Sequence, residues 1–215
     1  MIYVIMCGGI YRMWDTPRQL LKINGETIVE RTMRLLREAG VQNIAISSNT
    51  GMFDHLGVPV LKHANSYDAA GYNDCRGHWC DAFFFTGVPT CYLFGDVVYS
   101  PKAIRTIVDT ETDGIMFFGS APPFAPEYPK QYAEPFAFKV MDPDRLAQAV
   151  KDVKRLEAEG RFRRKPIAWE VWNIISRGTD GDVDTIDYNS YVHINDYTCD
   201  IDHPDEVGIF EGITR

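Results

Sequence analysis

The sequence predicts a single α/β domain built on a mainly parallel, doubly wound sheet, and three observations support this expectation. Short apolar runs of strand length alternate with amphipathic segments of helical length along the whole chain. At 215 residues the chain is long enough for one substantial core, whereas two independent cores would each be small. Polar residues follow several of the apolar runs, and ligands bind at that edge of an open α/β sheet.

Composition indicates a soluble globular protein, with 45% hydrophobic and 24% charged residues. The formal net charge of −8 argues against a nucleic-acid polymer as partner, because proteins that bind such polymers carry basic faces. No apolar run nears membrane-spanning length, and no basic region precedes the apolar start, so we expect neither a membrane partner nor a signal peptide. Five scattered cysteines without a C-x-x-C pair suggest no disulfide framework and no zinc site, which favours the cytoplasm.

The stretch of residues 1–25 organises the rest of the chain. An apolar run, Ile2–Met6, leads at once into Cys7-Gly8-Gly9, which predicts a buried strand and a loop whose backbone amides can cradle phosphate. Arg12 and Arg18 follow, and a guanidinium can grip a phosphate with two hydrogen bonds. We therefore expect Cys7, Gly8 and Gly9 to bind nucleotide and the two arginines to act on its phosphates. A strand followed by an ordinary glycine turn would explain the glycines alone.

Hydrophobic periodicity predicts the later elements in order. Residues 27–37 repeat apolar side chains at helical spacing, and Gly40 follows as a stop signal. Residues 142–159 repeat them over a longer amphipathic helix, whose apolar stripe we expect to be core. Strands are expected at residues 41–47, 58–61, 90–94, 114–118 and 134–140, with short ones at 183–186 and 191–194. Further helices are expected at residues 79–85, 101–108 and 166–176, and a last one begins at Pro204.

Two polar side chains stand directly beyond predicted strands. Asn49 follows the strand at 41–47 and is a candidate contact for a base or ribose, with a polar turn as an equal alternative. Asp96 follows the strand at 90–94. Because Mg²⁺ usually binds through one or two carboxylates plus substrate phosphates, Asp96 is a candidate magnesium ligand. A turn or N-cap role before the helix at 101–108 is the alternative.

The opening stretch closely resembles the N-terminal signature of the nucleotidyltransferases, G-x-G-x-R-M followed by P-K-x-L-L and a glycine. Ile10 stands where the family has its second glycine, and Arg18 replaces the family's lysine. The chain also ends in a similar way, since Asp200-Ile201-Asp202 followed by Pro204 resembles the family's D-I-D-x-P-E-D-L. The matching positions are Gly8, Arg12, Met13, Pro17, Leu20, Leu21 and Gly25 in the opening stretch.

The resemblance implies an enzyme that moves a nucleotidyl group from an NTP to a small phosphorylated acceptor and releases pyrophosphate. It implies Mg²⁺ held by Asp96 and Asp202. Residues 65–74 resemble the choline-phosphate cytidylyltransferase branch, which favours CTP and would place Asn73 beside the nucleotide, although a helix N-cap explains Asn73 nearly as well. In the family a glutamate near this point of the chain commonly touches the acceptor, so Glu134, together with Lys139 in the same predicted strand, is a candidate acceptor-binding residue.

The acceptor is expected to bind in an elaboration around residues 120–195. Trp169 and Trp172 share a helical face with Glu170 beside them, and two indoles with a carboxylate are the ingredients of a site for a cationic acceptor. The basic run at residues 161–165 could then take the acceptor's phosphate. Two tryptophans at this spacing are, however, more often plain core.

Two further function classes stay open from the sequence. A glycosyltransferase could use Asp200-Ile201-Asp202 as a D-x-D motif, although its place at the end of the chain argues against this. A non-catalytic nucleotide-binding module is suggested by Ile10 and Arg18. Release of pyrophosphate, transfer of sugar, or binding without turnover would separate the three.

Overall fold

The computed structural model describes residues 1–8, 16–63 and 79–214. Within these residues the central sheet contains seven strands: β1 (Ile2–Met6), β4 (Ile44–Ser48), β5 (Val60–Lys62), β6 (Thr90–Phe94), β8 (Ile115–Gly119), β9 (Pro135–Val140) and β10 (Val192–His193). Their spatial order is β10-β8-β9-β6-β1-β4-β5. Every pairing is parallel except those of β9, which runs antiparallel to both β6 and β8. The prediction of a mainly parallel sheet is confirmed.

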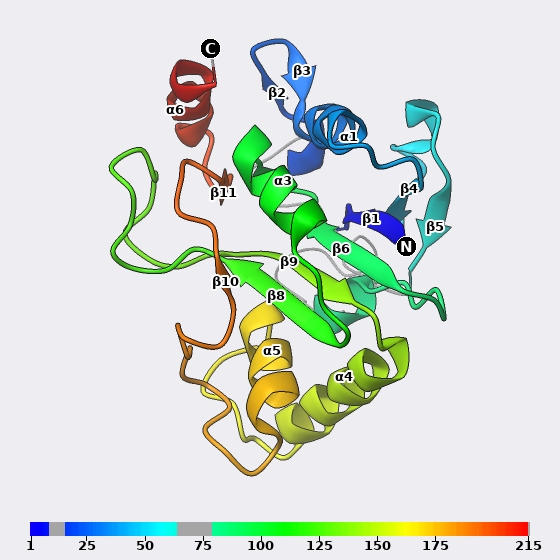
Figure 1. Cartoon of the computed structure of the whole chain (residues 1–215), viewed down its shortest axis with the longest axis vertical. Coiled ribbons are helices and arrows are strands. Elements are labelled where there is room, and N and C mark those ends of the chain that lie inside the picture. Colours follow the sequence, from blue (N-terminus) through cyan, green and yellow to red (C-terminus); the bar gives the residue numbers. More distant parts are fainter. Residues whose placement is uncertain (9–15, 64–78, 215) are drawn as a thin grey trace.

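Helices cover both faces of this sheet, as Figure 1 shows. On one side lie α1 (Ile28–Glu38) and α3 (Pro101–Asp109), and on the other lie α4 (Pro143–Ala158) and α5 (Ala168–Arg177). The helix α6 (Glu206–Ile213) lies beside a small hairpin of β2 (Lys22–Ile23) and β3 (Glu26–Thr27). Within the described residues, no helix is both long and apolar enough to cross a membrane.

Local sequence explains where α1 begins. The Thr27 hydroxyl accepts a hydrogen bond from the Glu30 backbone N–H, and the Glu30 carboxylate accepts one from the Thr27 N–H at 3.1 Å. These reciprocal bonds satisfy two N–H groups that a helix start leaves without partners. The apolar face that follows, including Ile28, Val29 and Leu36, is fully buried against the sheet. The helix therefore forms where both its cap and its apolar spacing agree.

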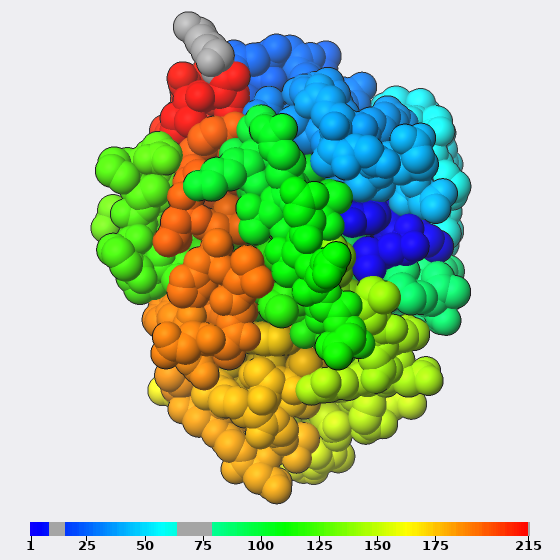
Figure 2. Space-filling view, viewed as in Figure 1, coloured from blue at the N-terminus to red at the C-terminus, as the bar shows by residue number. Residues whose placement is uncertain are grey.

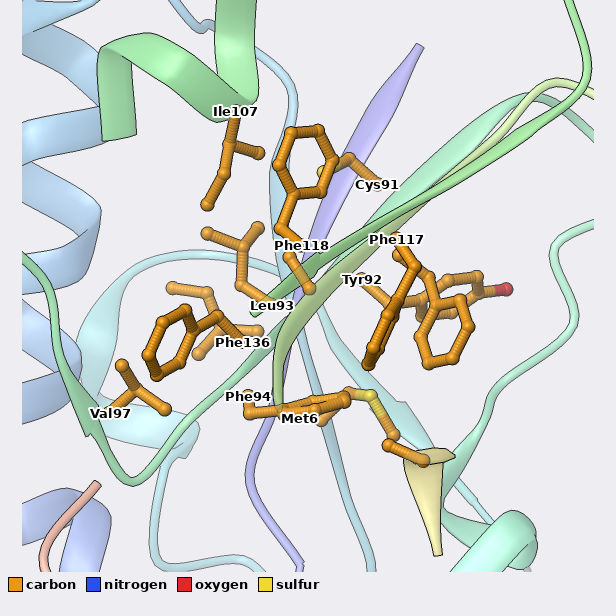
Figure 3. Packing of buried hydrophobic residues seen from close by; sticks show 14 of the residues in the cluster. Met6, Cys91, Tyr92, Leu93, Phe94, Val97, Ile107, Phe117, Phe118 and Phe136 are labelled. Carbon is orange, nitrogen blue, oxygen red and sulfur yellow. The ribbon is translucent and has the colours of Figure 1, made fainter. Parts of the chain in front are cut away.

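The core lies on both sides of the central strands. All five residues of β4 and of β6 are buried, as expected for parallel strands covered by helices on both faces. Aromatic rings fill the side under α5, where the ring centres of Phe117 and Phe138 lie 4.6 Å apart. Figure 3 shows Met6 beside Phe94, the residues that pair at the ends of β1 and β6. The sheet is thus rigidly packed up to the edge where these strands end.

The segment after β10 closes over α3. The Ser100 hydroxyl caps the start of α3 by accepting from the Ala103 N–H, and it donates to the Asp196 carboxylate at 2.6 Å. The Ser100 N–H donates to the Thr198 hydroxyl at 2.9 Å. Figure 2 shows this segment, in orange, lying against α3, in green. These buried contacts hold the segment after β10 against the start of α3, so that the chain continues from there toward the end of β6.

Three local expectations need correction. The predicted strand at 183–186 does not form, because the Asp182 carboxylate accepts hydrogen bonds from the Asp184 and Thr185 N–H groups and so turns the chain. The last helix begins at Glu206, two residues after the predicted Pro204. The segment predicted as helix at 79–85 is a single 3₁₀ turn, Trp79–Ala82.

Candidate active site

A cleft of about 450 Å³ opens where β1 and β6 end. Its walls come from segments far apart in the chain: the ends of two strands, the 3₁₀ turn η1 (Arg18–Leu20), the loop before β9, the start of α5 and the segment before α6. The sequence-predicted residues that line it are Gly8, Arg18, Asp96, Glu134, Trp169 and Asp202. The carboxyl edge of the sheet is therefore hollowed, and six of the ten predicted site residues that the structure describes meet there.

Gly95 allows Asp96 to stand close to β1. The Gly95 N–H donates to the Met6 carbonyl at 3.0 Å, and a Cβ at Gly95 would lie 2.5 Å from that oxygen. A Cβ there would also lie 2.9 Å from the Cys7 sulfur. Only glycine permits this approach of two backbones. Gly95 thus lets the ends of β1 and β6 approach each other, and the Asp96 carboxylate lies directly after this contact, in the cleft.

A short ribbon brings the end of the chain to Asp96. The strands β7 (Val97–Val98) and β11 (Cys199–Asp200) pair antiparallel, with Asp200 opposite Val97. The Ile201 N–H then donates to the Asp96 carbonyl at 3.2 Å. Three backbone-fixed carboxylates, those of Asp96, Asp200 and Asp202, consequently face one cleft.

Arg18 lies between Asp96 and Asp202, the two predicted metal ligands. One guanidinium nitrogen is 2.5 Å from Oδ2 of Asp96, and the other donates to Oδ1 of Asp202 at 2.7 Å. The second nitrogen also donates to the Ile201 carbonyl at 2.8 Å. The Arg18 side chain is only 11% exposed. A residue predicted to bind phosphate thus ties together two carboxylates predicted to bind metal.

Lys130 is the second cation of the cluster, and no sequence pattern selects it. Its Nζ donates to carboxylate oxygens of Asp200 at 2.5 Å, Asp202 at 2.7 Å and Glu134 at 3.2 Å. Burial alone would lower the pKa of Lys130, but the charges of Asp200 and Glu134 outweigh burial and raise it. The surrounding carboxylates therefore favour the charged form of Lys130. Because it closes a proline-rich loop with no periodic pattern, only the folded chain brings it to the site.

The carboxylates respond differently to this crowding. Burial, reinforced by the charge of Asp200, raises the pKa of Glu134 to about 8. Burial also raises the pKa of Asp200 to about 6, although Lys130 opposes the shift. Burial works against Asp202 as well, but hydrogen bonds from Lys130 and contact with Arg18 lower its pKa overall. Asp202 is thus the member of the trio that stays ionised most readily.

The donor set fits a magnesium ion. Ligand oxygens of Glu134, Asp200 and Asp202 all lie within 4.8 Å of one another, and oxygen is the donor that Mg²⁺ prefers. With Asp96, four carboxyl groups face the two cations Arg18 and Lys130. Even when Glu134 is protonated, as its raised pKa favours near neutral pH, three carboxylates exceed two cations and leave an excess of negative charge. That excess is the charge a divalent ion would neutralise.

The predicted nucleotide loop is described only in part. Gly8 lines the cleft and packs so tightly that a Cβ would lie 2.8 Å from Nε2 of His63. The Cys7 N–H donates to the Ser47 carbonyl inside the sheet, and burial followed by the charge of Asp96 holds the pKa of its buried thiol well above the usual range. Gly9, Arg12 and Asn73 lie outside the described residues. Asn49 directly follows β4 and is not among the described residues that line the cleft.

Glu134 and Lys139 lie at opposite ends of β9. Because β9 runs antiparallel to β6, the start of β9 lies beside the carboxyl end of β6. Glu134 precedes β9 and so stands beside the carboxyl end of β6. Lys139 pairs with Cys91, near the start of β6, and its Nζ donates to the carbonyls of Ile107, Val108 and Thr110. Glu134 therefore lines the cleft and Lys139 does not, which corrects the expected place of Lys139 beside the acceptor.

The structure separates the components of the expected cation site. Trp169 lines the cleft, whereas Trp172 stacks on Phe117 in the core and donates from Nε1 to the Ser190 hydroxyl. Glu170 is fully buried: Oε2 accepts from the Ile167 N–H at 2.8 Å, and Oε1 lies 2.9 Å from the Arg164 guanidinium. The carboxylate is thus used inside the protein. From the basic run, Arg164 reaches the cleft wall.

Solved structures of other proteins share this architecture over almost their whole length. An assigned glucose-1-phosphate thymidylyltransferase from Bacillus anthracis, solved with sucrose, is 15% identical with a TM-score of 0.61, over 100% of this chain and 95% of that one. The inositol-1-phosphate CTP transferase of T. maritima is 14% identical with a TM-score of 0.55, over 99% and 96%. The chain has the nucleotidyltransferase fold. No protein-family model and no curated protein matches the sequence, so structure alone carries this identification of the nucleotidyltransferase fold.

Proposed function

We propose that the protein is a nucleotidyltransferase. It transfers a nucleotidyl group, with CTP as the favoured donor, to a small phosphorylated acceptor and releases pyrophosphate. The observation that carries the proposal is the meeting of Arg18, Asp96 and Asp202 in one cleft at the carboxyl edge of the sheet, although Arg18 and Asp202 are 184 positions apart. The two ends of the sequence signature thus contact each other through charged groups.

The chemistry needs positioning and charge neutralisation more than proton transfer. An oxygen of the acceptor phosphate attacks the α-phosphorus in line with the departing pyrophosphate, and its low basicity makes a protein base unnecessary. Lys130, held by three carboxylates, supplies a fixed positive charge behind the acidic side chains that line the cleft. Arg18 supplies a second one, with a planar fork that suits phosphate oxygens. Arg18 binds and orients phosphate oxygens, while Lys130, whose Nζ already contacts three carboxylates, adds positive charge nearby.

Asp96 and Asp202 are the residues that would hold Mg²⁺. The ion, when bound, supplies charge neutralisation at the α-phosphate and the acceptor phosphate. Asp202 suits this role because contacts with Lys130 and Arg18 favour its ionised form. Asp96 suits it because the Gly95 approach fixes its backbone against β1.

The acceptor is better matched by a neutral polyol phosphate than by an amine. Glu170 is buried and paired with Arg164, so the cleft wall near Trp169 presents a guanidinium and an indole and no carboxylate of Glu170. The two similar proteins above are named for glucose 1-phosphate and inositol 1-phosphate, both neutral apart from phosphate. CTP is favoured by the sequence resemblance at residues 65–74 and by the named donor of the second protein.

One assay tests the proposal: pyrophosphate release with each of four NTPs against a panel of acceptors. The panel pairs sugar 1-phosphates and inositol 1-phosphate with phosphocholine and phosphoethanolamine. We expect release with CTP and a polyol phosphate. Transfer of sugar from a nucleotide sugar without pyrophosphate release would instead support the D-x-D glycosyltransferase, and NTP binding with no turnover on any acceptor would support a binding module.

A further inference from the structure

We infer that Arg18 is an internal competitor of the metal ion: its guanidinium occupies the space between Asp96 and Asp202 that a divalent cation would take, and it must leave when the cation binds. The inference rests on the proposed function, because it concerns the same two carboxylates. It adds a conformational step, in which Arg18 leaves the two carboxylates. The structure shows the state before that step.

Three of the four carboxylate oxygens of Asp96 and Asp202 already contact a cation. Oδ2 of Asp96 lies 2.5 Å from Arg18, Oδ1 of Asp202 accepts from Arg18 at 2.7 Å, and Oδ2 of Asp202 accepts from Lys130 at 2.7 Å. Magnesium binds oxygen at about 2.0–2.1 Å and demands near-octahedral geometry. A guanidinium at hydrogen-bonding distance from both carboxylates and a dication bound to the same oxygens cannot share that space, since like charges would also repel.

Arg18, rather than Lys130, is the cation that can yield. Lys130 has a side chain only 4% exposed and holds three carboxylates, so its loss would leave several buried charges uncompensated. Arg18 is more exposed, at 11%, and lies on the cleft wall. Moving Arg18 alone frees one oxygen on Asp96 and one on Asp202 together. A single side-chain movement therefore opens both ligands.

A bound nucleotide would also supply a new anionic partner for Arg18. A guanidinium released from two carboxylates needs a new anion, and phosphate oxygens offer bidentate acceptors. An NTP carries both the phosphates and the metal into the cleft. Arg18 would then pass from carboxylates to phosphates as the metal passes to the carboxylates. This links occupation of the metal site to the arrival of nucleotide.

Mn²⁺ binding, followed by the loss of the free-ion electron paramagnetic resonance signal, tests the inference without turnover. Arg18→Gln should bind Mn²⁺ on the order of tenfold more tightly than the wild type or better, the scale of one charge-assisted hydrogen bond. Arg34→Gln is the matched control, because Arg34 also bridges two carboxylates, Glu26 and Glu38, but on α1. It should leave Mn²⁺ affinity unchanged. Equal or weaker Mn²⁺ binding by Arg18→Gln overturns the inference.

A second measurement uses the wild-type protein, in case Arg18→Gln does not fold. Arginine side-chain N–H signals are followed by NMR during a Mg²⁺ titration, with Arg18 assigned by its absence in Arg18→Lys. The Arg18 signals should shift as Mg²⁺ binds, while those of Arg34 stay in place. Unchanged Arg18 signals at saturating Mg²⁺, or no metal binding at all, would overturn the inference.

Pyrophosphate release measured in parallel separates this inference from the proposed function. If the wild type releases pyrophosphate and Arg18→Gln has unaltered Mn²⁺ affinity, the inference about Arg18 is overturned and the proposed enzyme activity stands. If Arg18→Gln binds Mn²⁺ more tightly but the wild type releases no pyrophosphate with any NTP and acceptor, the inference about Arg18 stands and the proposed enzyme activity is overturned.

Discussion

Lys130 and Lys139 are buried to nearly the same extent, at 5% and 6% exposure, yet their surroundings differ completely. Lys130 lies before β9 at the carboxyl edge of the sheet and contacts three carboxylates. Lys139 lies near the other end of β9 and donates to three backbone carbonyls, those of Ile107, Val108 and Thr110, at the end of α3. The same side chain at the same depth thus serves two different purposes.

The partners explain the difference. A helix leaves its last carbonyls without partners and carries partial negative charge at that end, so a lysine there completes the helix. The carboxylates around Lys130 complete no helix or strand, and burying several like charges is costly even when they are paired. Such a cost at the edge where ligands bind points to a site kept for function. Burial alone would not have separated the two lysines.

The largest expected effect is on the rate of pyrophosphate release, and it comes from changes at the carboxyl edge of the sheet, where Lys130 lies. Asp96→Asn and Asp202→Asn should each lower the rate of pyrophosphate release by roughly 10²-fold or more, the scale of one preorganised electrostatic contact. Asp109→Asn, close to Lys139 at the other edge, should leave the rate unchanged. Circular dichroism melting checks that each variant folds. Near-normal release by both folded metal-ligand variants would break the distinction between the two edges.

Removing each lysine compares the two surroundings directly. Lys130→Met leaves buried carboxylates without their cation and should cost about 3–5 kcal/mol in the free energy of unfolding. Lys139→Met leaves carbonyls without a donor and should cost about 1–3 kcal/mol. Urea unfolding measures both. Only Lys130→Met should also reduce pyrophosphate release in protein that remains folded; a similar loss in Lys139→Met would remove the contrast.

Gly95 tests how tightly the carboxyl edge is built. Gly95→Ala forces a Cβ to within 2.5 Å of the Met6 carbonyl, so the strand ends must move apart, at a cost of roughly 1–3 kcal/mol, and turnover should fall. Gly208→Ala is the control, because it lies in α6 with open space around it. It should stabilise the protein by about 0.5–1 kcal/mol. Thermal melts that place both variants on the same side of the wild type would contradict this account.

His63 gives the most gradual effect, which appears only as the pH falls below about 6.5. It stands beside Gly8, and burial lowers its pKa to about 4, with Asp81 opposing the shift and Lys62 reinforcing it. The folded protein therefore binds the proton less readily than the unfolded chain, whose histidine titrates near 6.5. Stability should fall as the pH drops from about 6.5 toward 4. His63→Gln should weaken this dependence in urea unfolding; an unaltered pH profile would show that His63 adds no such term.

Several local features were correctly predicted from the sequence because they depend on neighbouring residues. The strands Ile2–Met6 and Thr90–Phe94 have the predicted bounds, and α1 follows Thr27 as its spacing and cap require. The position of Asp96 directly beyond β6 follows from the same local pattern. Where a nearby side chain competed for the backbone, as Asp182 does, the strand prediction at 183–186 was wrong.

From the sequence by itself came the order of most elements, the mainly parallel α/β sheet and the carboxylates in the two stretches that resemble the family signature. Only the tertiary structure decided that β9 runs antiparallel, which brings Glu134 into the cleft and takes Lys139 away from it. It alone placed Lys130 and Arg18 among the carboxylates and buried Glu170. The physical reason is range. Helical and strand periodicity is set within a few residues, whereas strand direction and buried ion pairs depend on contacts between residues up to 184 positions apart.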